Sequence, residues 1–97
     1  MKIFRNQEMT EEVGNLDLGT AIAGQAKTYT FYVLNDLDVT IEDLEFSIDN
    51  KEVVINNFPK LLKANESNAL TITWSPSVTI KKALKTELKI KGYELYE

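Results

Sequence analysis

The 97-residue sequence contains no cysteine and no histidine. Without cysteine, neither a disulfide nor a thiolate metal site can form. Without histidine, the chain lacks the most common general base, the usual zinc ligand and the base of Ser/His and Cys/His nucleophile pairs. We therefore predict a protein that is not an enzyme and that uses no cofactor.

Long apolar runs and an excess of positive charge are also missing. No window approaches the roughly 18 apolar residues of a membrane helix, and the start, MKIFRNQEMTEE, lacks the apolar region of a signal peptide. Eleven Lys and Arg stand against fifteen Asp and Glu, which gives a net charge of −4. A protein that binds nucleic acid mainly through its phosphates normally shows the opposite balance. We expect no membrane contact, no nucleic-acid partner and synthesis in the cytoplasm.

What the sequence does contain is a period of two. Apolar and polar residues alternate within residues 28–35, 68–74 and 83–92, as they do in strands with one buried face. Trp74 lies on the apolar side of the second run, where we expect it in the core. Short strands at roughly ten-residue spacing, separated by polar turns, are typical of a two-sheet antiparallel sandwich. The length suits one all-β domain with a packed core.

The side of the alternation changes near Glu42 and Asp43. The apolar residues of segment 39–41 have odd numbers, whereas those of segment 44–48 have even numbers. Because a one-residue shift would expose one of the two sets, we predict a β-bulge between them.

A similar change follows Ile90, after which the apolar positions become Tyr93 and Leu95. Gly92 lies at the change, and glycine commonly permits a bulge. We predict a second bulge there.

Longer motifs resemble a known group of domains. The segments LDLGTAIAGQAKTYTFYVLNDLD, VVINNFPKLLKANESNALTITWSPS and LKTELKIKG follow in an order that resembles the immunoglobulin-like domains of the abnormal-spindle-like and major-sperm-protein-like group. Where that group often has Pro-Gly before Glu-Ser, this chain has Ala64 and Asn65, and Asn also tolerates a left-handed turn. The matching positions, within residues 15–92, are Leu16 to Gly19, Gly24, Phe31, Asn35, Pro59, Glu66, Ser67, Trp74, Pro76 and Gly92.

The resemblance implies an immunoglobulin-like sandwich of about seven strands over residues 15–97, preceded by an arm or edge strand at residues 1–14. Domains of this kind are similar to small proteins of tailed bacteriophages that serve as decoration or other accessory components. The resemblance therefore implies a structural protein of the virion, bound to a capsid or other virion scaffold or to its own copies, with no small-molecule substrate. The alternative is a cytoplasmic adaptor that binds a peptide by strand addition to a sheet edge.

Acidic residues are concentrated in one part of the chain, since seven of the fifteen lie between Asp36 and Glu52. We interpret Asp36 and Asp38 as turn residues that bond to the local backbone. A calcium site at the same two residues is the alternative, although the spacing lacks the D-x-[DN]-x-[DN]-G signature. A glycosidase pair that includes Glu45 would need a cleft, which a solvated turn does not offer.

Basic residues are concentrated elsewhere, since five of the eleven lie between Lys81 and Lys91. Lysines on the outer face of a last strand discourage edge-to-edge aggregation. The two charged regions could orient a partner, or they could be two solvated faces of a sheet.

Apolar residues that a core does not require are candidates for binding a partner. Tyr32 and Leu34 lie on the opposite face of their strand from Phe31 and Val33, so they either belong to a covered sheet face or form an interface. The other candidates are Tyr93 and Tyr96, which could instead cover the sandwich edge, and Ile3 and Phe4, which could pair with a neighbouring subunit.

Overall fold

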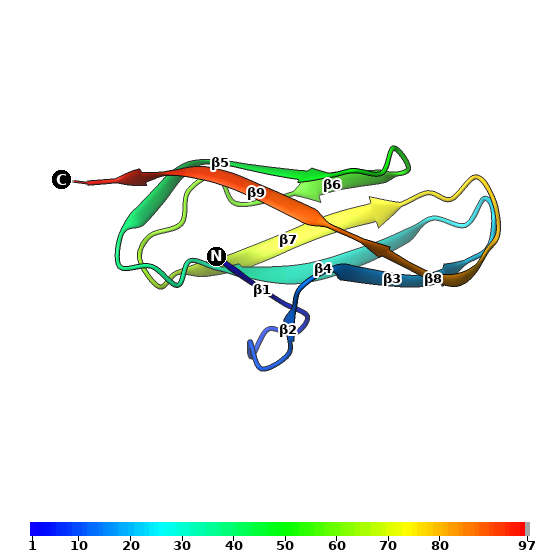
Figure 1. Cartoon of the computed structure of the whole chain (residues 1–97), viewed down its shortest axis with the longest axis horizontal. Helices are drawn as coiled ribbons and strands as arrows, with labels where there is room; N and C mark the ends of the chain where they lie inside the picture. The colour runs from blue at the N-terminus through cyan, green and yellow to red at the C-terminus, as the bar shows by residue number, and fades with distance from the viewer. Residues whose placement is uncertain (97) are drawn as a thin grey trace.

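The computed structural model describes residues 1–96, which form two layers of antiparallel strands (Figure 1). The first layer is a five-stranded sheet in the order β2-β1-β4-β7-β6. Its strands are β1 (Lys2–Phe4), β2 (Glu12–Val13), β4 (Lys27–Leu34), β6 (Val53–Asn57) and β7 (Ser67–Trp74). An uninterrupted ladder between β4 and β7 forms the centre of this sheet.

The second layer is built around one long run of chain. Its strands are β3 (Leu16–Ala21), β5 (Thr40–Ile48), β8 (Ile80–Thr86) and β9 (Leu88–Leu95). β8 and β9 are separated only by Glu87 and continue in one direction across the layer (Figure 1). β3 pairs with β8 and β5 pairs with β9, on opposite sides of this run (Figure 1). The layer is therefore staggered, because each half of the run has a strand partner on one side only within residues 1–96.

The predicted alternation places the core between the layers. Trp74 is 1% exposed, and Phe31, Val33, Leu70 and Ile72 are equally well buried. Each such side chain stabilises the fold by roughly 1.5–3 kcal/mol through the apolar area that it removes from water. The strands expected within residues 28–35, 68–74 and 83–92 are confirmed, and so is the core position of Trp74.

The predicted fold class is confirmed, since residues 1–96 form strands and no helix. Residues 1–96 form nine strands instead of about seven. Two of them, β1 and β2, come from the N-terminal segment, and the last run of chain is divided in two at Glu87. Within residues 1–96 no helix could cross a membrane.

The bulge predicted near Glu42 and Asp43 is confirmed. Glu42 lies opposite Tyr93 and Glu45 lies opposite Lys91. Three residue steps along β5 therefore correspond to two steps along β9. Asp43 takes the extra step with a positive φ of 51°. The bulge turns the even-numbered apolar residues after it toward the core, where Leu44 is buried.

The second predicted bulge, at Gly92, is wrong. The inward series on β9 continues through Leu88, Ile90 and Gly92, and Tyr93 lies on the outer face opposite Glu42. Gly92 is needed because a Cβ atom there would lie 2.6 Å from Ile41 Cγ2 and 2.8 Å from a methyl group of Leu44. The change of alternation on β9 needs no bulge, because Tyr93 and Leu95 are exposed residues of the outer face.

The turn at Ala64 and Asn65 has the form that the sequence predicts. Asn65 adopts a left-handed φ of 60°. Glu66 closes the turn, because its side chain accepts a hydrogen bond from the Lys63 N–H at 3.1 Å. An asparagine therefore supplies the left-handed residue of this turn without a glycine.

Candidate interaction surfaces

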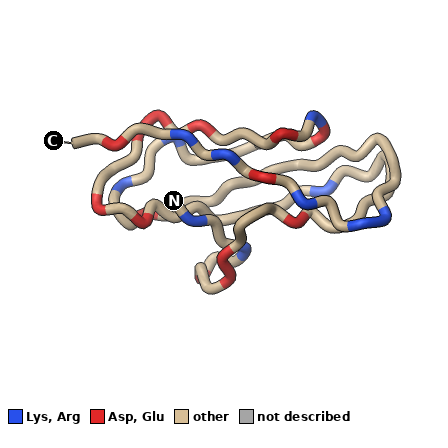
Figure 2. The backbone as a smooth tube through the Cα atoms, viewed as in Figure 1, with Lys and Arg blue, Asp and Glu red and all other residues tan. Residues whose placement is uncertain are grey.

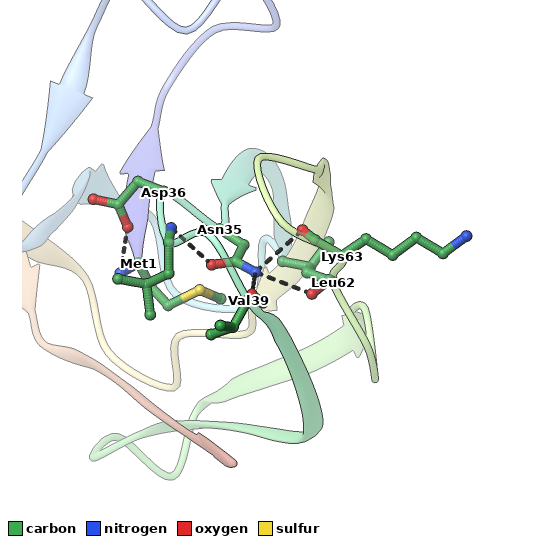
Figure 3. A network of polar contacts seen from close by, with 7 residues as sticks. Met1, Asn35, Asp36, Val39, Leu62 and Lys63 are labelled. Carbon is green, nitrogen blue, oxygen red and sulfur yellow. Dashed lines mark hydrogen bonds and ion pairs between the residues drawn. The ribbon is translucent and has the colours of Figure 1, made fainter. Parts of the chain in front are cut away.

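A buried amide holds one end of the sandwich together. Asn35 Nδ2 donates hydrogen bonds to the carbonyl oxygens of Val39, Leu62 and Lys63 at 2.8, 3.0 and 3.1 Å (Figure 3). Asn35 Oδ1 accepts one from the Leu37 N–H at 3.1 Å. Because Asn35 itself is fully buried, it ties the loop after β4 to the loop before β7. We call this end of the molecule the tip.

The ends of β5 and β9 belong to the same tip. Ile41 and Leu62 exchange two backbone hydrogen bonds of 2.9 and 3.0 Å, which attach β5 to the loop that Asn35 holds. Thr40, next to Ile41, lies opposite Leu95 at the end of β9. Backbone pairing thus brings segments from three parts of the chain together.

Exposed apolar side chains gather on these segments. Tyr93 is 55% exposed and Tyr96 is 73% exposed. Single exposed apolar residues are common, but a group of them on neighbouring segments is typical of a docking surface. We define the tip patch as Leu37, Leu61, Tyr93, Leu95 and Tyr96, all of which are exposed.

The other predicted partner-binding residues lie away from the tip patch. Tyr32 and Leu34 are half-buried on the outer face of the first sheet, opposite the buried Val33. Ile3 is 7% exposed and belongs to the core, and Phe4 is 8% exposed. Phe4 shares the outer face with Tyr32, its cross-strand partner. A contact through Ile3 would require β1 to leave the sheet.

Asp36 carries a short ion pair at the tip. Its carboxylate lies 2.9 Å from the amino group of Met1 (Figure 3). The pKa of Asp36 is lowered, chiefly by the hydrogen bond from this amino group. Within residues 1–96 no group of three or more carboxylates lies close enough together to hold a metal ion. The calcium alternative at Asp36 and Asp38 stays a prediction.

Glu52 has a different local partner at the other end of the sandwich. Its carboxylate accepts hydrogen bonds from the Ser77 hydroxyl and from the Ser77 N–H, the latter at 3.0 Å. These bonds lower the pKa of Glu52. Trp74 Nε1 itself is buried and has no partner within bonding distance in residues 1–96. Glu52 thus closes the loop after β7.

Two tyrosines have raised pKa values. For Tyr29 the cause is burial, followed by the negative charge of Asp17. For Tyr96 the cause is a hydrogen bond to Glu94, followed by the charge of that carboxylate. Each shift follows from ordinary surroundings and marks no group prepared for proton transfer.

The separated charges of the sequence are also separated in space. Figure 2 shows basic residues along the run of β8 and β9, with acidic residues at the tip and along β5. Lys85, Lys89 and Lys91 are exposed, and Lys91 lies opposite Glu45 of β5. One side of the lysine row therefore faces an acidic strand.

Two hollows lie beside β9, and no pattern in the sequence predicts them. One, of about 550 Å³, is lined in part by Phe46, Phe58 and Ile90, with the two rings 5.6 Å apart. The other, of about 470 Å³, lies between β9 and the strands β1 and β2. The alternation predicts that these side chains point inward, but which of them remain uncovered depends on how the layers meet. No signal in the sequence could have shown this.

Fold and surfaces together define a small all-β antiparallel sandwich protein. Comparison of the chain with known protein families, with curated proteins and with solved structures gives no match. Function must therefore be argued from the surfaces themselves.

Proposed function

We propose that this protein is a non-enzymatic structural module that docks on a larger protein assembly through the tip patch. The observation that carries the proposal is the group of five exposed apolar side chains at one end of the sandwich. The Asn35 hydrogen bonds and the pairing of Ile41 with Leu62 hold the backbone beneath them. Apolar side chains on a rigid base lose little conformational freedom on binding, which favours affinity.

The assembly that we propose is a bacteriophage virion, with the chain as a capsid decoration or other head- or tail-associated protein. The immunoglobulin-like type of sandwich suggested by the sequence motifs is the main support. The shape agrees with it, because a block of 49 × 25 × 16 Å that binds by one end leaves its remaining surface available. An interaction domain of this kind needs neither cofactor nor substrate.

The test is the protein content of purified virions from phage that encode either the natural chain or the variant Leu61→Glu with Tyr96→Glu. We expect the natural chain in a copy number that fits the symmetry of the capsid or tail, and loss of the variant. Val54→Glu is the matched control, because Val54 is exposed on β6 outside the tip patch. Before the virion test, thermal unfolding should show that each variant has the same melting temperature as the natural chain. Virions without the natural chain, or with equal amounts of the tip variant, would overturn the proposal.

The adaptor function, binding of a peptide by strand addition, is favoured by one specific observation. Within residues 1–96, β9 has a strand partner on one edge only. An adaptor would bind its peptide one to one, whereas a virion component occurs in many copies on a symmetric scaffold.

A further inference from the structure

One edge of β9 is open along its length. β5 occupies one edge, and β3 lies on the other side of the run but pairs only with β8, where its ladder stops at Leu16 opposite Thr86 (Figure 1). Within residues 1–96, the eight residues Leu88–Leu95 thus have no strand paired with them on that side. Most strands have about 5–6 residues, and proteins usually cover or shorten an exposed edge.

A partly apolar hollow of about 470 Å³ lies beside this open edge. Leu88 and Ile90 of β9 form one wall, and Ile3 of β1 with Val13 of β2 forms the other. The walls therefore come from both layers of the sandwich. Leu88, Ile90 and Val13 are only half-buried, although all three pack against the core. A further strand beside β9 would place its inward side chains in this hollow and bury these residues.

The outer face of β9 is basic. Lys89 and Lys91 are exposed there, in alternation with the inward Leu88 and Ile90. Toward β5, Lys91 lies opposite Glu45. Toward the open edge, Glu12 of β2 lines the hollow, but within residues 1–96 no strand pairs with β9 there to place an acidic residue opposite either lysine. Opposite charges on neighbouring strands stabilise a sheet, whereas like charges destabilise it.

We propose that an extended segment of a partner protein, in which acidic and apolar residues alternate, adds to this edge of β9 as a further strand. Its backbone completes the second layer, its apolar side chains fill the hollow and its acidic side chains pair with Lys89 and Lys91. The site uses the backbone edge of β9, whereas the tip patch uses exposed side chains, of which Tyr93 and Leu95 also belong to β9. Strand addition at Lys89 and Lys91 does not depend on docking at the tip.

The charges favour a different chain over a second copy of this one. In an antiparallel pair of two copies of β9, registers centred on Ile90 or Lys91 place lysine opposite lysine. No register places acidic residues opposite both Lys89 and Lys91, because β9 carries only Glu94 and the residue before it is Glu87. The cross-strand contacts of a β9 pair are therefore poor.

The test uses synthetic peptides as long as β9 and the full chain. In the first peptide Glu and Val alternate, in the second the same residues are grouped by type, and in the third Lys replaces Glu. We expect only the first peptide to bind at millimolar concentration. In NMR spectra its binding should slow amide hydrogen exchange at alternate residues of β9 and leave the exchange of β6, an edge strand of the first sheet, unchanged.

A charge reversal identifies the lysines that act. Lys89→Glu with Lys91→Glu should weaken binding of the Glu peptide at least about tenfold and should allow the Lys peptide to bind. Lys81→Glu with Lys82→Glu is the matched control, because these exposed lysines lie on β8, where β3 is already paired. The control should bind the Glu peptide as the natural chain does.

Three results would overturn the inference. They are failure of the Glu peptide to bind, an equal loss of binding in both double variants, and protection from exchange at residues other than β9. If the natural chain forms a dimer in which the β9 amides are protected from exchange, the strand added to β9 comes from a second copy of the chain and not from a partner protein. All of these results leave the tip patch untested, so this inference and the proposed function can fail separately.

Discussion

Asn35 shows how one polar side chain can fix the arrangement of a surface. The sequence places it at the end of a strand and before a turn, and that much is confirmed by the bond from the Leu37 N–H to Oδ1. Its bonds to Leu62 and Lys63 link residues 27 and 28 positions apart, which no local pattern could indicate. The residues of the tip patch were also only partly predicted, since Tyr93 and Tyr96 were expected but Leu37, Leu61 and Leu95 were not.

Replacement of Asn35 should therefore be costly. We expect Asn35→Ala to lower the free energy of unfolding by about 3 kcal/mol, because three carbonyl groups and one N–H lose their buried partner. Urea denaturation measures this difference. Asn57→Ala, at an exposed position of β6, should change the free energy by less than about 0.5 kcal/mol. Equal effects of the two substitutions would show that the Asn35 bonds do not hold the tip.

Glu52 predicts a pH dependence of stability. Its pKa in the folded protein lies below the ordinary value of 4.5, so the ionised carboxylate is bound more favourably in the folded state. The resulting stabilisation is present above pH 4.5 and is lost as the pH falls through the lowered pKa. We expect the difference in urea midpoint between the natural chain and Glu52→Gln to be constant near neutral pH and to shrink in acid.

Ser77→Ala provides the matched control for this pH dependence. It removes the hydroxyl that is the main cause of the lowered pKa. In the Ser77→Ala background, Glu52→Gln should therefore have a smaller and less pH-dependent effect. If the urea midpoint of Glu52→Gln falls in acid as much as that of the natural chain, other carboxylates cause the loss of stability.

At the scale of the element, the pair β5–β9 shows what alternation can and cannot predict. The bulge on β5 follows from the sequence because two apolar sets of opposite parity must both face the core. The sequence does not show that Tyr93 and Leu95 are exposed on the outer face of β9, where no second bulge is needed. Gly92 is required by the close approach of Ile41 and Leu44, which is a matter of packing between strands.

Gly92→Ala should therefore destabilise the protein by about 1–3 kcal/mol, the usual cost of forcing an extra methyl group into a packed site. Gly14→Ala is the control, because a Cβ atom there meets nothing within 4 Å. Thermal unfolding of both variants measures the contrast. If Gly92→Ala is as stable as Gly14→Ala, Ile41 and Leu44 do not approach the strand as closely as described.

At the scale of the whole molecule, the N-terminal segment is part of the sandwich. β1 pairs with β4 and contributes Ile3 to the core. Residues 1–14 cannot serve as a freely exchangeable arm without exposing that core. The surfaces for which we propose association are the tip patch and the open edge of β9, and both are expected to receive other proteins.

We accordingly expect the purified chain to be a monomer at physiological salt. Size-exclusion chromatography with light scattering measures the mass. The variant Leu61→Glu with Tyr96→Glu should have the same mass as the natural chain. A discrete oligomer that dissociates in this variant would mean that the tip patch binds copies of the chain itself.

The sequence by itself determined the all-β class, the main strands, the first bulge and the core position of Trp74. These features depend on the alternation of neighbouring side chains, which the order of residues records directly. Only the tertiary structure decided that Ile3 belongs to the core, that five exposed apolar side chains lie on neighbouring segments at the tip and that β9 keeps one edge open. The physical reason is that exposure, closeness and strand partnership depend on which distant segments meet, and a local pattern does not carry that information.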